Sequence, residues 1–246
     1  IVVPTDVGDA EQVERLCDTA VARYGRVDVW VNNAAVTLFG RLEETPREAY
    51  EKVIETNLLG CVNGAREAIR QFREQGHGRL INVSSMVAHA GQPFTSAYVA
   101  SKWGIRGLSE CLRMELADAP SIHVTTILPA SIDTPLFQQG ANYVGQPAKA
   151  MTPVYPPEKV ATAILSAAKY PVRERFVGNS GRMMAAIRTL VPPLGEKMME
   201  RKVHSDHFAE DLPIEPSPGN LFDSHGSGSV RGGWIEREHG GSSSGM

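Results

Sequence analysis

The stretch Val27-Asp28-Val29-Trp30-Val31-Asn32-Asn33-Ala34-Ala35 indicates how this chain folds, because a short apolar strand runs directly into a polar turn. Apolar strands followed by breakers recur along the sequence, and helical patterns separate them. This alternation is typical of a mostly parallel sheet that helices cover on both faces. The expected strands are residues 1–7, 27–31, 79–84, 122–128 and 175–177, and the expected helices are residues 8–24, 46–74, 98–117 and 158–169.

The segment Tyr98-Val99-Ala100-Ser101-Lys102 opens one of these helices, thirteen residues after Ser85. Residues i and i+4 share a helix face, so Tyr98 and Lys102 are expected to point the same way. An ammonium beside a phenol lowers the pKa of the phenol toward neutral pH, where it can exchange a proton. With the Ser85 hydroxyl, these groups can hold a carbonyl oxygen and protonate it. The alternative is an amphipathic helix with an exposed lysine and a half-buried tyrosine.

The composition narrows the class of protein. The 246 residues suit one α/β domain, and a formal net charge of −3 gives no reason to expect nucleic acid as a partner. No run reaches the ~20 apolar residues of a transmembrane helix, and we expect a cytoplasmic protein with no transmembrane segment. The three cysteines, Cys17, Cys61 and Cys111, are expected to be reduced thiols.

No histidine shows the spacing of a metal site, so we expect no metal. His204, Asp206 and His207 lie close in the sequence, but a solvated junction is the expectation for them.

Five motifs in register resemble the short-chain dehydrogenase/reductase family over residues 1–180. The tyrosine–lysine segment and Ser85 are joined by Asn57, which lies 41 residues before Tyr98. The other two motifs follow strands: Asn32-Asn33-Ala34-Ala35 and Pro129-Ala130-Ser131-Ile132-Asp133-Thr134-Pro135. The resemblance implies a Rossmann-like, doubly wound parallel sheet and an oxidoreductase that interconverts an alcohol and a ketone or aldehyde with NAD or NADP.

The resemblance also implies roles for the catalytic candidates. Tyr98 would be the general acid/base, and Lys102 would lower its pKa and hold the nicotinamide ribose. Ser85, selected over Ser84 by the thirteen-residue spacing, would polarise the substrate oxygen. Asn57 would kink its helix and anchor a water beside the lysine.

Cofactor contacts are implied for a further set of residues. Ala35 and Ala130 stand where the family commonly has glycine, and alanine avoids the positive φ that glycine accepts. The implied contacts are Asp6, Val7, Asn32, Ala34, Tyr98, Lys102, Ile132 and Thr134. NAD and NADP are not distinguished, since the strand that the family uses to read the 2′-position is not in the sequence.

The family would also place a glycine-rich phosphate-binding turn before residue 1, so we expect an N-terminally incomplete sheet. This favours an alternative function, a catalytically silent fragment that serves as a scaffold or binding module.

Beyond the domain at residues 1–181, we expect a helical extension at 182–204, broken at Val191-Pro192-Pro193. It either closes the substrate cleft or touches a membrane or an apolar partner. Residues 205–246 are rich in Pro, Gly and Ser, which predicts a flexible, disordered tail. Apolar residues in 136–152 hint at a bulky apolar substrate, and the resemblance implies a homo-oligomer formed through two long helices.

Overall fold

The computed structural model describes the chain apart from residues 181–182, 184–186, 188–189, 210–212, 224–227 and 241–246. In this described part, the main sheet has four parallel strands in the order β1-β3-β4-β6. Their bounds are Val29–Asn32, Gly78–Val83, Ile122–Pro129 and Glu174–Val177. The central pairing runs from Gly78 opposite Ile122 to Val83 opposite Ile127, so the carboxyl ends of β3 and β4 meet at one edge of the sheet.

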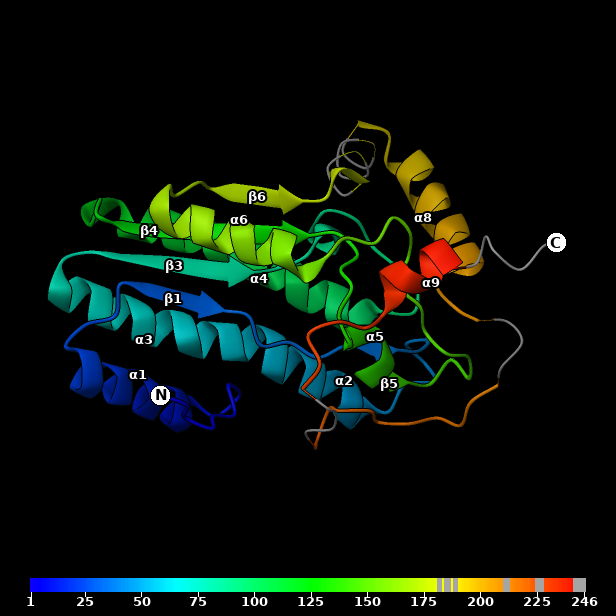
Figure 1. Ribbon diagram of the computed structural model, residues 1–246, viewed down its shortest axis with the longest axis horizontal. Helices are drawn as coiled ribbons and strands as arrows, with labels where there is room; N and C mark the ends of the chain where they lie inside the picture. Colours follow the sequence, from blue (N-terminus) through cyan, green and yellow to red (C-terminus); the bar gives the residue numbers. More distant parts are fainter. Residues whose placement is uncertain (181–182, 184–186, 188–189, 210–212, 224–227, 241–246) are drawn as a thin grey trace.

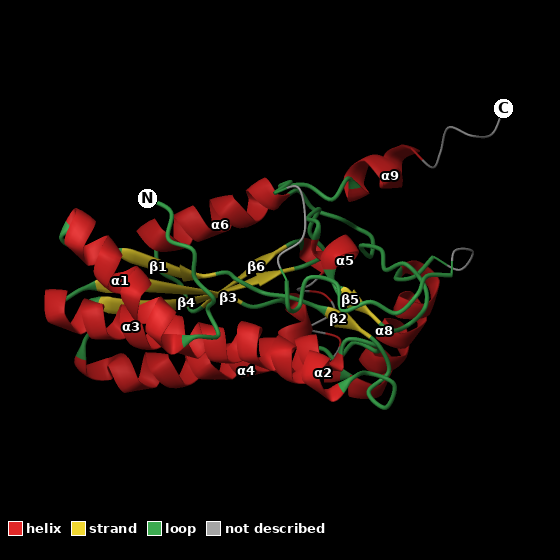
Figure 2. Ribbon diagram, turned by 90° about the horizontal axis from the view of Figure 1, so that it is seen from below, coloured by secondary structure: helices red, strands yellow, loops and turns green. Residues whose placement is uncertain are grey.

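Helices cover both faces of this sheet, as the alternating pattern predicts. On one face lie α3 (Gly60–Gln75) and α4 (Ser96–Glu115), and α6 (Pro157–Lys169) lies on the other (Figure 2). α1 (Ala10–Tyr24) packs on α3. Each face buries an apolar cluster; Phe72 and Leu80 are in the first, and Ile127 and Ala163 are in the second. The doubly wound α/β architecture is therefore confirmed.

Local sequence sets the ends of the helices. The Asp9 carboxylate caps α1 by accepting a hydrogen bond from the backbone N–H of Gln12, at 3.1 Å. Gly25 and Gly76 follow α1 and α3 with φ of 79° and 83°, a left-handed conformation that suits glycine. The two helices consequently end where the glycines predict.

The expected helix over residues 46–74 is formed, but a π-helical turn interrupts its α-helical hydrogen bonding. It consists of α2 (Arg47–Ile54), a π-helical turn η1 (Glu55–Leu59) and α3. Asn57 lies inside the π turn and is 1% exposed. Single π turns often mark functional sites.

Additional short elements lie beyond the carboxyl ends of the sheet (Figure 1). β2 (Leu38–Phe39) pairs in parallel with β5 (Ala141–Asn142), and α5 (Leu136–Gln139) lies between β4 and β5 in the chain. Two 3₁₀ turns, η2 (Met86–Ala88) and η3 (Leu116–Asp118), follow β3 and α4. These elements are too short to be read from sequence periodicity.

The prediction of a strand at residues 1–7 is wrong. This segment has no strand conformation in the structure, and Ile1 and Val2 are 65% and 92% exposed. Instead the carbonyl of Val7 accepts a hydrogen bond from Asn63 Nδ2 of α3, at 2.9 Å. An apolar run becomes a strand only if a neighbouring strand pairs with it, and residues 1–7 lie against a helix.

The prediction of a disordered tail is also wrong for the described residues of 205–246. Phe208, Leu221 and Trp234 are 6%, 4% and 6% exposed, so they are part of the core. Ser217 pairs with Asn142 as an antiparallel bridge, and α9 (Trp234–Gly240) is helical. The composition of this segment suggests disorder, but widely spaced apolar anchors bury enough surface to hold it.

The helical extension is partly described. α8 (Pro192–Asp206) begins at the predicted break, with proline in its first turn. Most of the residues expected to form the preceding half lie outside the described part of the chain. Among the helices that the structure describes, none is long and apolar enough to cross a bilayer.

Candidate active site

The carboxyl ends of β3 and β4 and the start of α4 bring the predicted catalytic residues together. Ser85 follows β3 and caps η2, where its Oγ accepts a weak hydrogen bond from the backbone N–H of Val87, at 3.4 Å. α4 carries Tyr98 and Lys102 on the face that packs toward β3. The side chains of Tyr98 and Ser85 lie close enough to interact.

The two neighbouring serines, Ser84 and Ser85, have different hydrogen-bond partners. Ser84 Oγ donates to the backbone carbonyl of Lys102 at 2.8 Å and is 2% exposed, so it ties β3 to α4. The Ser85 side chain interacts with Tyr98. The choice of Ser85 as the catalytic serine stays a prediction.

Lys102 is a buried cation rather than a surface lysine. It is 2% exposed, and its Nζ donates a hydrogen bond to the carbonyl of Val83 at 2.9 Å. Burial lowers the pKa of this ammonium to about 8, because desolvation penalises the charged form. The alternative of an ordinary amphipathic helix required an exposed lysine here, and the structure excludes it.

The pKa of Tyr98 moves opposite to the sequence expectation. Burial raises the pKa of the phenol to about 12, and the hydrogen bond with Ser85 only partly offsets this. Lys102 Nζ lies 5.4 Å from the centre of the tyrosine ring, over its face and not at its hydroxyl. The expected lowering of the pKa by Lys102 is therefore wrong, since desolvation dominates.

Asn57 links the π turn both to Val36 and to α4, and both polar atoms of its side-chain amide are paired. Its Nδ2 donates to the carbonyl of Val36 at 2.9 Å and to Ser101 Oγ at 3.1 Å. Its Oδ1 accepts from the backbone N–H of Val36 at 2.8 Å. Ser101 Oγ in turn donates to the carbonyl of Tyr98 at 2.7 Å. The sequence analysis missed Ser101, although it lies inside the tyrosine–lysine motif.

Asn32 makes structural hydrogen bonds between β1, α3 and β3. Its Oδ1 accepts from Trp30 Nε1 at 2.8 Å, and its Nδ2 donates to the carbonyl of Cys61 at 3.2 Å and to Asn82 Oδ1 at 2.9 Å. Asn82 Nδ2 continues the chain to Ser109 Oγ at 2.9 Å. The side chain implied to lie along the adenosine ribose is thus already committed to protein partners.

Four of the predicted residues line one cavity of about 300 Å³ beside β1. They are Val7, Asn32, Ala34 and Asn57, and much of the remaining lining comes from apolar residues of α1 and β1, such as Val13 and Val29. Asp6 lies nearby but is exposed, and its carboxylate accepts hydrogen bonds from the backbone N–H of Gly8 at 2.9 Å and from Lys52 Nζ at 3.5 Å.

Ile132 and Thr134 lie on the loop after β4 and do not line this cavity. Ile132 forms a bridge with Tyr155, and the backbone N–H of Thr134 donates to the carbonyl of Ile132 at 2.8 Å. Ala130, at the position where glycine is commoner, does not have a positive φ. Alanine therefore causes no strain in this loop.

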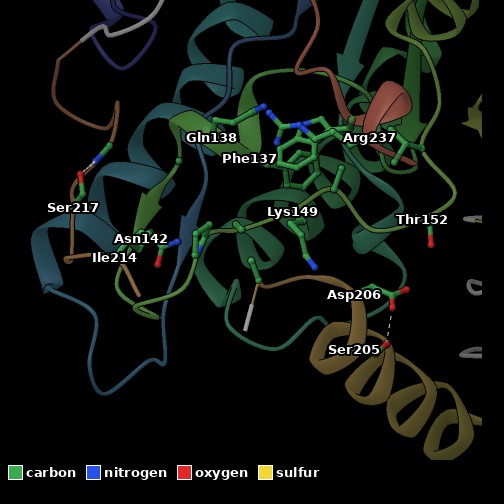
Figure 3. Close-up of a pocket in the computed structure, with 18 residues that line it drawn as sticks. Phe137, Gln138, Asn142, Lys149, Thr152, Ser205, Asp206, Ile214, Ser217 and Arg237 are labelled. Atoms are coloured by element: carbon green, nitrogen blue, oxygen red, sulfur yellow. Dashed lines mark hydrogen bonds between the residues drawn. The ribbon is translucent and has the colours of Figure 1, made fainter. Parts of the chain in front are cut away.

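A second cavity of about 670 Å³ lies on the side of α5 and α8. Figure 3 shows Phe137, Gln138 and Arg237 in one region of its wall and Lys149, Ser205 and Asp206 in another. None of Asn57, Ser85, Tyr98 and Lys102 lines it. The structure therefore separates this cavity from the candidate catalytic group.

His207 is the one member of the expected solvated junction that the structure buries, at 1% exposed. Its Nδ1 lies 2.7 Å from the carbonyl of Lys149, and its Nε2 lies 3.0 Å from Gln92 Nε2. A carbonyl can only accept, so Nδ1 carries the proton. Among the described residues, no group of three or more His, Cys, Asp or Glu side chains is placed to hold a metal ion.

Comparison with known proteins identifies the family. Residues 1–142 match the family described as short chain dehydrogenase. The chain is 36% identical over 240 residues to the Uncharacterized oxidoreductase YxnA of Bacillus subtilis, which is 95% of this chain and 67% of that protein. Along the curated relatives that match first, the chain spans between 34% and 67% of their length.

Solved structures agree with this assignment. A short-chain dehydrogenase from Streptomyces avermitilis matches with a TM-score of 0.66 and 27% identity, over 82% of this chain and 80% of that one. An alcohol dehydrogenase from Thermococcus sibiricus, complexed with 5-hydroxy-NADP, matches with a TM-score of 0.58 and 28% identity, over 70% of each chain. From its sequence motifs, its doubly wound sheet and these matches, the chain belongs to the short-chain dehydrogenase family.

Proposed function

We propose that this chain is a nicotinamide-dependent oxidoreductase that interconverts an alcohol and a ketone or aldehyde. The observation that carries the proposal is the placement of Ser85 and Tyr98 together beside the buried ammonium of Lys102. The oxidoreductase names of the relatives support it, and the similar structure that holds 5-hydroxy-NADP supports a nicotinamide cofactor.

Each group has a distinct part in the reaction. With a pKa of about 12, Tyr98 keeps its proton at neutral pH and can donate it to a substrate carbonyl oxygen. Ser85 donates a hydrogen bond to the same oxygen. Lys102 is charged at pH 7 and lies over the face of the Tyr98 ring. A reduced nicotinamide, when bound, would supply the hydride for the carbonyl carbon. In the oxidative direction Tyr98 must first lose its proton.

The residues present fit part of such a cofactor. The cavity of about 300 Å³ reaches the carboxyl end of β1, which is where ligands bind in doubly wound sheets. Apolar Val7 and the small residues Ala34 and Gly60 line it, which suits an apolar ring face. Lys102 Nζ has three N–H donors and gives one to Val83, so further donors can reach ribose hydroxyls.

Replacing the proton donor tests the mechanism. Tyr98→Phe should lower kcat by about 10²–10⁴-fold, because general acid catalysis is lost. Turnover of carbonyl substrates is followed by the absorbance of NADH and NADPH, tested separately to decide between the two cofactors. Tyr170→Phe, at a tyrosine that is 72% exposed, is the control. Undiminished turnover in Tyr98→Phe contradicts the mechanism.

An apolar substrate is the class we propose. An apolar cluster rich in methionine and phenylalanine lies beside the catalytic candidates. It includes Met86, which follows Ser85, and Phe94, which precedes Tyr98, together with Phe137 and Met151. Activity should therefore rise with the length of the alkyl chain in a series of ketones. Equal kcat/KM across the series would exclude this class.

The alternative of a catalytically silent scaffold gains no support from the relatives. Titrating NADH and NADPH into the protein and watching nicotinamide fluorescence separates the two functions, because a scaffold would bind neither.

We further propose a homo-oligomer formed through α3 and α4, which light scattering can measure. The free thiols Cys17, Cys61 and Cys111 support a reducing, cytoplasmic location.

A further inference from the structure

The segment of residues 231–237, which we call the C-terminal clamp, folds back onto the loop after β4 across about a hundred residues of sequence. Trp234 Nε1 donates to the carbonyl of Thr134 at 3.1 Å, and the indole packs edge-on against Phe137 with ring centres 5.9 Å apart. Gln138 Nε2 of α5 donates to the carbonyl of Gly232 at 2.7 Å. The clamp therefore grips the loop on both sides of Pro135.

Asp133 adds a buried hydrogen bond between the loop and the clamp. Its side chain is 2% exposed, and its Oδ1 accepts a hydrogen bond from the backbone N–H of Trp234 at 2.7 Å. A buried carboxylate is costly unless a donor satisfies it. Trp234 supplies a donor from the clamp, so the buried position of Asp133 depends on the clamp being in place.

The residues on either side of Asp133 stay partly exposed. Ile132 and Thr134 are of intermediate exposure, whereas Asp133 is buried, and Thr134 meets the clamp through its backbone carbonyl. The backbone N–H of Asp133 donates to the carbonyl of Tyr155 at 2.9 Å, which fixes the loop from the side of α6. The clamp thus holds the backbone between the two residues that the family resemblance gives to the nicotinamide carboxamide and the phosphates.

We propose that Asp133 and Trp234 are positioning residues for the cofactor, because the C-terminal clamp holds the Ile132–Thr134 loop in the conformation that receives it. This inference rests on the proposed function for the identity of the cofactor. Neither residue is proposed to touch substrate. They act through the backbone of Ile132 and Thr134.

The clamp can be loosened at two separate points. Trp234→Ala removes the indole, and Gly232→Ala places a Cβ 2.5 Å from the carbonyl oxygen of Thr134, which pushes the clamp off the loop. Asp133→Asn keeps an acceptor for the Trp234 N–H and serves as the conservative variant. Glu236→Ala, at an exposed position of the same short helix, is the matched control.

Hydrogen exchange without cofactor tests the hold on the loop. The amides of Asp133 and Thr134 should exchange at least tenfold faster in Trp234→Ala and Gly232→Ala than in the wild type. Asp133→Asn and Glu236→Ala should exchange like the wild type. Unchanged exchange in both loosened variants would overturn the inference, whether or not the protein is an enzyme.

Cofactor binding tests the consequence. In Trp234→Ala and Gly232→Ala, the Kd for NADH or NADPH should rise about tenfold, and KM for the cofactor should rise more than kcat falls. Faster exchange with an unchanged Kd would show a purely structural contact and also overturn the inference. If the wild type binds neither cofactor, the proposed function fails, and with it the positioning role, while the exchange data still decide the hold on the loop. If Trp234→Ala does not fold, Gly232→Ala and Trp234→Phe, which loses the bond to Thr134 but keeps an aromatic ring, give the same readouts.

Discussion

At the scale of single residues, the site is defined by what burial does to Lys102 and Tyr98. Both groups are pushed toward their neutral forms, the lysine to a pKa of about 8 and the tyrosine to about 12. At neutral pH the tyrosine is a proton donor and the lysine a cation beside it.

We expect substitution of Ser85 to affect catalysis and substitution of Ser84 to affect stability. Ser85→Ala should lower kcat about 10²–10³-fold, as removal of one oxyanion donor does, with little change in the free energy of unfolding. Ser84→Ala should remove the buried hydrogen bond that ties β3 to α4 and lower the free energy of unfolding by about 0.5–1.5 kcal/mol, since the helix still pairs the carbonyl of Lys102. Steady-state kinetics and urea unfolding of both variants measure this. A larger loss of kcat in Ser84→Ala would reverse the assignment.

The lowered pKa of Lys102 implies that the free energy of unfolding depends on pH. Its pKa is about 8 in the folded chain and 10.5 ordinarily, so between these values the unfolded state binds more protons. The free energy of unfolding should therefore rise with pH over that window, by up to about 3 kcal/mol. Denaturant unfolding of the wild type and Lys102→Met from pH 7.5 to 9.5 checks this, because the variant should lack the rise. Parallel curves would contradict it.

At the scale of elements, α3 approaches β1 closely because of one glycine. A Cβ on Gly64 would lie 2.1 Å from Asn32 Oδ1, whose amide is held by three hydrogen bonds. The helix and the strand can be this close only where no side chain intervenes.

Gly64→Ala should accordingly lower the free energy of unfolding by about 1–3 kcal/mol, as overpacking does. Gly107→Ala is the matched control, since its Cβ would meet nothing within 4 Å on the exposed side of α4. Helix propensity predicts that this control gains about 0.5–1 kcal/mol. Urea unfolding compares the two, and equal effects would refute the packing argument.

At the scale of the whole molecule, His207 joins segments that are far apart in the chain. It connects the end of α8 to Lys149 and to Gln92, in the loop between Ser85 and Tyr98. Phe39, Phe137 and Phe208 surround its ring. Burial lowers the pKa of this imidazole to about 4.

This histidine predicts acid sensitivity. Between pH 6.5 and about 4 the unfolded state binds more protons than the folded state, so the free energy of unfolding should fall as the pH falls, by up to about 3 kcal/mol. His207→Gln should be less stable at pH 7 but should lose less on acidification. Unfolding at pH 7 and pH 4.5 measures the difference. An equal loss in both proteins would contradict the prediction.

The elements and the catalytic candidates could be predicted from sequence because they depend on local patterns. Strand β3, helix α4 and the spacing from Ser85 to Tyr98 are examples. The direction of the Tyr98 pKa, the burial of His207 and the docking of Trp234 could not, because each depends on groups that only the tertiary fold brings near. The exposed segment of residues 1–7 shows the same limit, since pairing partners decide whether an apolar run becomes a strand.

The π turn at Glu55–Leu59 has a consequence for the rotation of the long helix that contains it. A π turn holds one residue more than an α turn, and one residue corresponds to about 100° around a helix axis. The turn therefore offsets the angular phase of α2 from that of α3. Deleting one residue, such as the 49% exposed Leu59, would restore α-helical winding and remove this offset, so that α2 and α3 share one continuous phase. Asn57 would then no longer reach Val36 and Ser101 together.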